Sequence, residues 1–124
     1  MVEGRCVLVV EDEAKIRKLV VEGLKGAGFD VLEAESGEQA LDLLRQHGDA
    51  IGWLFTDIRL PGVINGWNVA FEYRFHNPTR PVVYATGYDP ASGSPVHGSI
   101  VFQKPYRPSQ IVEAFQRLSQ ESAA

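Results

Sequence analysis

The stretch CVLVVED at Cys6–Asp12 places two carboxylates directly after a run of apolar residues. An apolar run of this kind is typical of a strand that is buried on both faces of a sheet. Four further runs follow, at residues 29–34, 51–56, 81–86 and 99–103. Amphipathic segments alternate with these runs, and that alternation is typical of a parallel sheet covered by helices on both faces. The sequence therefore predicts an α/β fold.

The segments between the runs carry the 3.6-residue periodicity of helices. In the first segment, Ile16, Leu19, Val20 and Leu24 recur on one helical face, which we expect to be buried. The second helix is expected to begin at Ser36, which forms a capping-box pattern with a glutamine three residues later. Further helices are predicted at about residues 65–75 and from residue 108 onward.

Two segments depart from this regular pattern. Phe29–Ala34 contains charged residues, which favours an edge strand. Residues 89–98 contain two prolines and two glycines without an apolar period, so the fourth helix is expected to be reduced or irregular. The 124 residues suit one domain at 1–124, with its core at about 4–119 and a tail at 120–124.

The composition excludes several classes of function. Twelve Lys and Arg residues stand against sixteen Asp and Glu, which gives a net charge of −4 and argues against nucleic acid binding. No apolar stretch approaches the roughly 20 residues of a membrane helix, and the N-terminus lacks a signal-peptide pattern. We therefore expect a cytoplasmic protein without a membrane partner. The single cysteine, Cys6, excludes an internal disulfide.

Polar residues finish four of the five apolar runs. Glu11 and Asp12 follow the first run, Asp57 the third, Thr86 ends the fourth and Lys104 follows the fifth. In open α/β sheets the functional crevice lies at the carboxyl ends of the strands, so these side chains are expected to converge.

Three converging acids repel one another unless they share a cation. Mg²⁺ is the cation expected here, because it binds carboxylates, backbone oxygen and phosphate oxygens. With the ion bound and Lys104 nearby, the carboxylate of Asp57 can attack a phosphoryl group, and Thr86 can donate a hydrogen bond to it. These residues predict an aspartyl-phosphate acceptor.

Four motifs together resemble the receiver (CheY-like) domain of two-component response regulators. They are VVEDE at 9–13, TDIRLPG at 56–62, ATG at 85–87 and KP at 104–105. Each motif is weak alone, but the four occur in the family's order and span essentially the whole chain. The resemblance implies a flavodoxin-like (βα)5 fold, a doubly wound parallel sheet with strand order 2-1-3-4-5. It also implies a signalling phosphoacceptor rather than an enzyme.

The resemblance also implies roles for individual residues. Asp57 is the phosphoacceptor, and Asp12 and Asp57 hold Mg²⁺ directly with the backbone carbonyl of Arg59. Glu11 assists the metal through water.

At the phosphoryl group itself, Thr86 is the implied switch hydroxyl and Lys104 the implied cationic partner. The implied protein partners are a histidine kinase or histidine phosphotransfer protein and a downstream regulatory protein. Phosphorylation is expected to shift the population of conformations that such a partner recognises.

The sequence departs from the family pattern at several positions. Val101 stands where the family usually has an aromatic switch residue, three positions before the lysine. YATGY at 84–88 resembles a subgroup of stand-alone receivers with a Phe/Tyr-Ala-Thr-Gly motif and a reduced fourth helix. Arg59 and Tyr88 are candidate modulators, since each lies two positions beyond a site residue and is long enough to reach over the site.

Two other functions remain open at this stage. A pseudo-receiver would bind partners through its surface without taking up phosphate, and Val101 keeps that hypothesis open. A phosphohydrolase of the haloacid-dehalogenase type also uses an aspartyl nucleophile, but that class needs a second Asp where this chain has Arg59. The sequence does not identify the stimulus, the kinase, the output partner or the phosphoryl lifetime, and it leaves a homodimer open.

Overall fold

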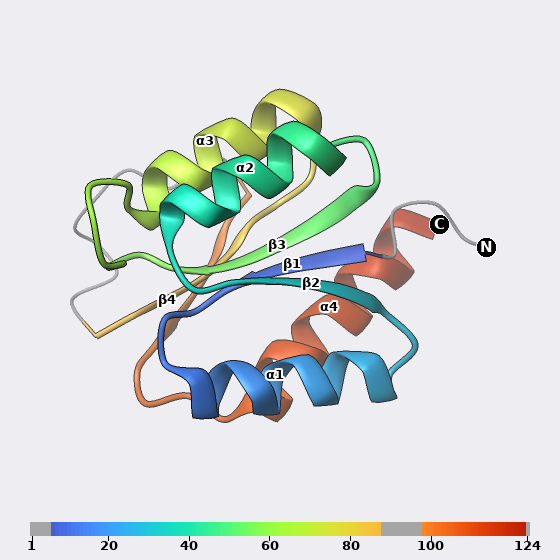
Figure 1. Cartoon of the computed structure of the whole chain (residues 1–124). Helices are drawn as coiled ribbons and strands as arrows, with labels where there is room; N and C mark the ends of the chain where they lie inside the picture. The colour runs from blue at the N-terminus through green and yellow to red at the C-terminus, as the bar shows by residue number, and fades with distance from the viewer. Residues whose placement is uncertain (1–5, 88–97, 124) are drawn as a thin grey trace.

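The computed structural model describes residues 6–87 and 98–123, which form a doubly wound α/β fold (Figure 1). The strands are β1 (Cys6–Val10), β2 (Asp30–Ala34), β3 (Ile51–Asp57), β4 (Val83–Thr86) and β5 (Ile100–Gln103). They form one parallel sheet in the order β2-β1-β3-β4-β5. This confirms the predicted strand order, and β2 is an edge strand as its charged residues predicted.

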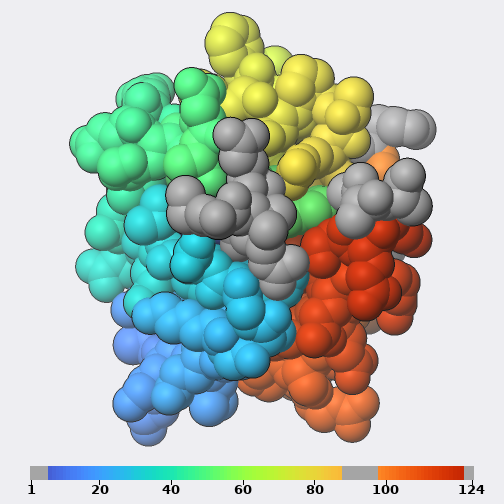
Figure 2. Space-filling view, turned by 90° about the vertical axis from the view of Figure 1, so that its right-hand side faces the viewer, coloured from blue at the N-terminus to red at the C-terminus, as the bar shows by residue number. Residues whose placement is uncertain are grey.

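Among the described residues, two helices cover each face of the sheet. The helices are α1 (Ala14–Gly26), α2 (Gly37–His47), α3 (Gly66–His76) and α4 (Pro108–Ala123). In Figure 1, α2 and α3 lie on one face and α1 and α4 on the other. Figure 2, which looks at the right-hand side of Figure 1, shows the same two layers, with green and yellow atoms above blue and red ones.

The alternation of side chains along each strand divides the core between the two layers. Val7 and Val9 of β1 pack with α1 and α4, whereas Leu8 and Val10 pack with α2 and α3. All seven residues of β3 are buried, because it is the central strand of the sheet. Trp53 and Phe55 are both buried in it.

Side-chain caps fix where two of the helices begin. The Ser36 hydroxyl accepts a hydrogen bond from the Gln39 amide at 3.1 Å, as the capping pattern predicted. The Gln39 side chain accepts from the amide of Glu35 and not from that of Ser36, so the pair is not a full capping box. A reciprocal box occurs at α3, where Asn65 and Asn68 each accept from the other's amide at 3.0 Å.

One sequence prediction about the helices is wrong. Leu19 of α1 is 55% exposed, and Val21 is buried on the same helix. The buried face of α1 is rotated toward the side of Arg17, which reaches Glu33 of β2. Residues 120–123, which were assigned to a tail, continue α4 as a helix. Their Gln, Glu and Ala residues favour a helix, and no Gly or Pro ends it.

The predicted irregular connection falls almost entirely on residues 88–97, outside the described residues. Among residues 6–87 and 98–123, no helix is long and apolar enough to cross a membrane.

Candidate functional site

The strand pairing brings the predicted site residues to one edge of the sheet. β1 and β3 run side by side, with Val10 opposite Thr56, so Glu11 and Asp57 occupy neighbouring positions at the ends of these strands. Asp57 lies opposite Ala85 of β4, and β4 pairs with β5 up to Thr86 and Gln103.

The backbone continues this pairing by one residue beyond β5. The Lys104 amide donates to the Thr86 carbonyl at 2.7 Å, which brings Lys104 to the same edge. This edge lies on the left in Figure 1, where α1 also begins.

Three carboxylates converge at this edge. One oxygen from each of Glu11, Asp12 and Asp57 lies within 4.8 Å of the other two. Glu11 is 0% exposed and Asp57 is 1% exposed, whereas Asp12 is exposed. Two buried acids and one exposed acid make a set of hard oxygen donors that is open to solvent on one side, which suits Mg²⁺.

The carboxylate of Asp57 is buried with few partners. Lys104 Nζ lies 3.0 Å from Asp57 Oδ1 in an ion pair. Apart from that ion pair, neither Asp57 oxygen has a hydrogen-bond partner among the described residues. Burial, followed by the nearby Glu11, raises the pKa of Asp57 to about 8, although Lys104 opposes the shift. The group can therefore accept a cation, because its own surroundings do not compensate its charge.

The Glu11 carboxylate, unlike that of Asp57, accepts hydrogen bonds from two neighbouring groups. The Glu13 amide donates to Glu11 Oε2 at 3.0 Å, and the Tyr106 hydroxyl donates to Oε1 at 3.3 Å. Burial raises the pKa of Glu11, but Asp57, the Glu13 amide and Lys104 lower it by more, so the net pKa is below its usual value. Of the two buried acids, Asp57 is therefore the one that holds a proton more readily.

Lys104 supplies the positive charge of the site. Burial lowers its pKa, but Asp57 and Glu11 raise it by more, so the net pKa is above the usual value and the side chain is an ammonium. Its Nζ is 3.9 Å from Glu11 Oε1 in addition to its contact with Asp57. One cation thus faces both buried acids.

A glycine allows the loop after β3 to fold against the site. The Gly66 amide donates to the Ile58 carbonyl at 2.7 Å. A Cβ atom at Gly66 would collide with the backbone carbonyl of Asp57. Glycine is therefore needed at position 66.

The remaining predicted residues lie around this centre. Thr86 is 5% exposed and is the last residue of β4. Val101 pairs with Tyr84 and is partly buried with the α2–α3 core, where Tyr84 contacts the Trp67 ring at 4.8 Å. Aromatic side chains from β4 and α3 therefore lie beside the strand where the family usually has its aromatic residue. Arg59 is exposed in the loop after β3.

Tyr88, the other candidate modulator, lies outside the described residues.

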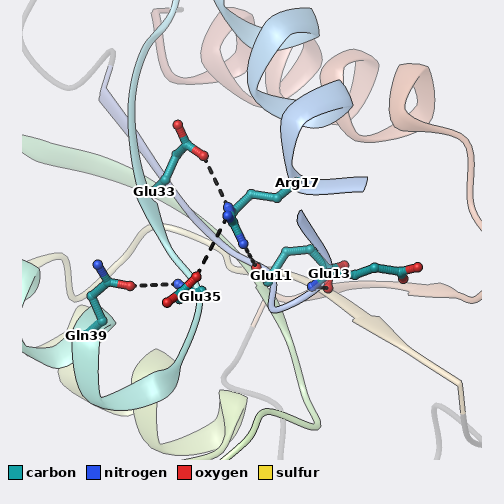
Figure 3. Close-up of polar contacts among 6 residues, drawn as sticks. All are labelled: Glu11, Glu13, Arg17, Glu33, Glu35 and Gln39. Carbon is teal, nitrogen blue, oxygen red and sulfur yellow. Dashed lines mark hydrogen bonds and ion pairs between the residues drawn. The ribbon is translucent and has the colours of Figure 1, made fainter. Parts of the chain in front are cut away.

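The sequence analysis missed two residues that contact the acids. Tyr106 follows Lys104 by two positions, and its ring packs edge-on against Phe55 while its hydroxyl reaches Glu11. Arg17 Nη1 donates to the Glu11 carbonyl at 2.8 Å (Figure 3). The sequence signals these contacts only through position. Tyr106 lies just after the lysine motif, and Arg17 lies in the first turns of the helix that follows the acids.

Comparison with solved structures supports the fold. A response regulator receiver protein from Sinorhizobium medicae WSM419 superposes with a TM-score of 0.82 and 34% identity, over 91% of this chain and 92% of that chain. The receiver domain of the hybrid histidine kinase CckA superposes with a TM-score of 0.77 and 29% identity, over 91% of this chain and 97% of that chain.

Curated relatives are longer proteins. A cyclic di-GMP phosphodiesterase from Thermotoga maritima is 36% identical over 83 residues, which cover 67% of this chain and 21% of that protein. The sensor kinase CckA of Brucella abortus is 32% identical over 82 residues, which cover 66% of this chain and 9% of that protein. The chain thus spans less than a quarter of the length of either relative.

A family description covers most of the chain. Residues 7–116 match the response regulator receiver domain, and this range contains both strands that carry the acids as well as Thr86 and Lys104. Because the strand order, the acidic centre and this match agree, the chain belongs to the response regulator receiver domain family.

Proposed function

We propose that Asp57 accepts a phosphoryl group in a Mg²⁺-dependent reaction, and that its phosphorylation changes the affinity of the chain for a regulatory protein. The observation that supports this proposal most strongly is the burial of the Asp57 carboxylate without hydrogen-bond donors in the described part of the chain. This carboxylate is buried beside Lys104 and two other acids, and no hydrogen bond from the described residues satisfies it. A group so placed suits phosphoryl transfer better than a structural role, since a structural acid is normally hydrogen-bonded.

The residues at the site fit a magnesium ion. Asp12 and Asp57 would hold it directly with the Arg59 carbonyl, and Glu11 would act through water. Bound Mg²⁺ would neutralise charge on the phosphoryl oxygens. Two observations support a magnesium site here. Oxygens of the three acids lie within 4.8 Å of one another, and the Asp57 oxygens accept no hydrogen bond from the described residues.

The chain's own residues account for the transfer. An oxygen of Asp57 attacks the phosphorus atom, an O–P bond forms, and the N–P bond of a phosphohistidine donor breaks, with the electron pair returning to the imidazole. Asp57 must be deprotonated for this attack, and Lys104 favours that state because it faces Oδ1. The Lys104 ammonium and the Thr86 hydroxyl then face the phosphoryl oxygens.

The partners follow from the same proposal. We expect the phosphoryl donor to be a histidine kinase or a histidine phosphotransfer protein, and the output to be binding to a downstream protein. The names of the relatives, which include a sensor kinase and probable transcriptional regulators, support a place in two-component signalling. We expect the chain to act as a cytoplasmic signalling phosphoacceptor that turns over no separate substrate.

The test is uptake of phosphate from a small donor. The wild-type chain is incubated with phosphoramidate, with Mg²⁺ or with EDTA, and analysed by intact mass spectrometry. We expect a mass increase of one phosphoryl group with Mg²⁺ only, and no increase for Asp57→Asn. Asp49→Asn is the matched control, because Asp49 is an exposed acid between α2 and β3, at the opposite end of β3 from Asp57.

Each contrary outcome identifies an alternative. A wild-type chain that takes up no phosphate with Mg²⁺ would support a pseudo-receiver. Steady turnover of a phosphomonoester would support a phosphohydrolase. Undiminished labelling of Asp57→Asn would show that another residue accepts the phosphoryl group.

A further inference from the structure

Arg17 forms a bridge between the acidic centre and the edge of the sheet. Its side chain extends from α1 and is 16% exposed. Nη1 donates to the Glu11 carbonyl at 2.8 Å, and Nε donates to Glu33 Oε1 at 3.2 Å. Nη2 lies 4.0 Å from Glu35 Oε2. Figure 3 shows the guanidinium between these three groups, which come from the residue after β1, from β2 and from the loop before α2.

We propose that Arg17 is a positioning residue for the magnesium site, an inference that rests on the proposed function. The contact that carries it is the one with the Glu11 carbonyl. That carbonyl belongs to the rigid peptide plane that also contains the amide and Cα of Asp12. Fixing its direction therefore fixes where the Asp12 side chain begins, although Asp12 itself is exposed.

The backbone amide of Glu11 is already fixed by the sheet. The Glu11 amide donates to the Ala34 carbonyl at 3.0 Å, which continues the pairing of β1 with β2. The chain turns away from the sheet after Glu11, since α1 begins at Ala14. Arg17 thus restrains the first peptide beyond the sheet, which is the one that leads into Asp12.

Arginine suits this position better than lysine. Its planar guanidinium offers several donors in fixed directions, so it can contact a carbonyl and a carboxylate together. The Gln39 side chain accepts from the Glu35 amide at 2.8 Å and so holds the backbone of that neighbour. The carboxylates of Glu33 and Glu35 orient the guanidinium and offset its charge.

A polar surface pocket of about 200 Å³ adjoins the guanidinium. It is lined by Arg17, Glu33, Ala34, Glu35 and Gln39. Loss of the Arg17 side chain would extend this pocket toward the Glu11 carbonyl, and water would then solvate the carbonyl. Removal of Arg17 is therefore expected to affect the orientation of the peptide more than the stability of the fold.

The direction of the change in Mg²⁺ affinity distinguishes positioning from simple charge. Arg17 is a cation close to a proposed cation site, so its removal would strengthen Mg²⁺ binding if only charge mattered. If Arg17 positions the acids, its removal weakens Mg²⁺ binding instead. Loss of a group that orients metal ligands typically weakens metal binding by about tenfold or more.

The experiment measures the Mg²⁺ dissociation constant by calorimetry for wild type, Arg17→Ala and Arg17→Lys, together with urea unfolding of each. We expect the dissociation constant to rise about tenfold for Arg17→Ala. A rise is also expected for Arg17→Lys, which keeps the charge but loses the forked geometry. Leu118→Ala is the control for stability, because Leu118 packs into the core near the end of α4, away from the site. Leu118→Ala should lower the free energy of unfolding but leave the Mg²⁺ dissociation constant within about twofold of the wild-type value, because Leu118 contacts no residue of the site.

Three results would overturn the inference. The first is tighter or unchanged Mg²⁺ binding by Arg17→Ala. The second is a Leu118→Ala variant that weakens Mg²⁺ binding as much as Arg17→Ala does. The third is wild-type protein that binds no Mg²⁺, which would overturn the proposed function as well and is therefore distinguishable from the first two.

Discussion

Replacing Asp57 by asparagine should stabilise the fold in the absence of a divalent cation. The wild-type carboxyl has a pKa of about 8 in the folded chain, against an ordinary value of 3.8. A carboxyl with a raised pKa holds a proton in the folded state that the unfolded chain releases, so stability falls as pH rises from about 4 to about 8. Asparagine has a similar shape and no charge, so it avoids this loss.

The size of the effect follows from the two pKa values. Each pH unit between the ordinary pKa and the working pH costs about 1.4 kcal/mol, which gives about 4 kcal/mol at pH 7 as an upper limit. The variant also changes the surroundings of Lys104, which keeps its contact with Glu11. We therefore expect Asp57→Asn to raise the free energy of unfolding by about 1 to 4 kcal/mol at neutral pH.

The assay is urea unfolding followed by circular dichroism in EDTA, at neutral pH and at about pH 4.5, where the Asp57 carboxyl is expected to destabilise wild type by only about 1 kcal/mol. Adding Mg²⁺ should stabilise wild type more than the variant, because ligand that binds only the folded state adds stability. An Asp57→Asn variant that is less stable than wild type in EDTA would contradict this expectation. A gain that does not depend on pH would refute it too.

Two further substitutions test the packing around the site. Gly66→Ala should destabilise the fold by about 2 kcal/mol, because its new Cβ collides with the Asp57 carbonyl. Gly26→Ala, at the end of α1 with no atom within 4 Å of the added Cβ, should be neutral or slightly stabilising; equal unfolding midpoints for the two variants would contradict this. Tyr106→Phe removes the hydroxyl that donates to the buried Glu11 and should cost about 1 kcal/mol in urea unfolding, and an unchanged midpoint would show that the hydroxyl contributes nothing.

The sequence predicted the sheet well because its signals are local. Continuous apolar runs mark the buried strands, and Glu11, Asp57 and Thr86 could be placed at one edge because parallel strands end together. The order of the strands came from the family resemblance and is confirmed.

The helix surfaces were harder to predict. Leu19 lies on the apolar side of α1 by periodicity, yet it is exposed, because which side of α1 is buried depends on how the helix sits on β1 and β2 and beside α4, about 90 residues away in the chain. Periodicity describes one helix and cannot include such a neighbour.

The contacts of the site were the least predictable part. Tyr106 reaches Glu11 across 95 positions of sequence, and Arg17 reaches the carbonyl of Glu11 rather than its side chain. Neither contact belongs to a motif, because each depends on how two elements meet in space.

The most direct test of the account is the location of the phosphoryl group. The chain is treated with phosphoramidate and Mg²⁺, the acyl phosphate is reduced with borohydride, and the digested protein is analysed by tandem mass spectrometry. We expect homoserine at position 57 with Mg²⁺ and unmodified Asp57 with EDTA. Modification at another residue, or equal modification of Asp57 with EDTA, would contradict it.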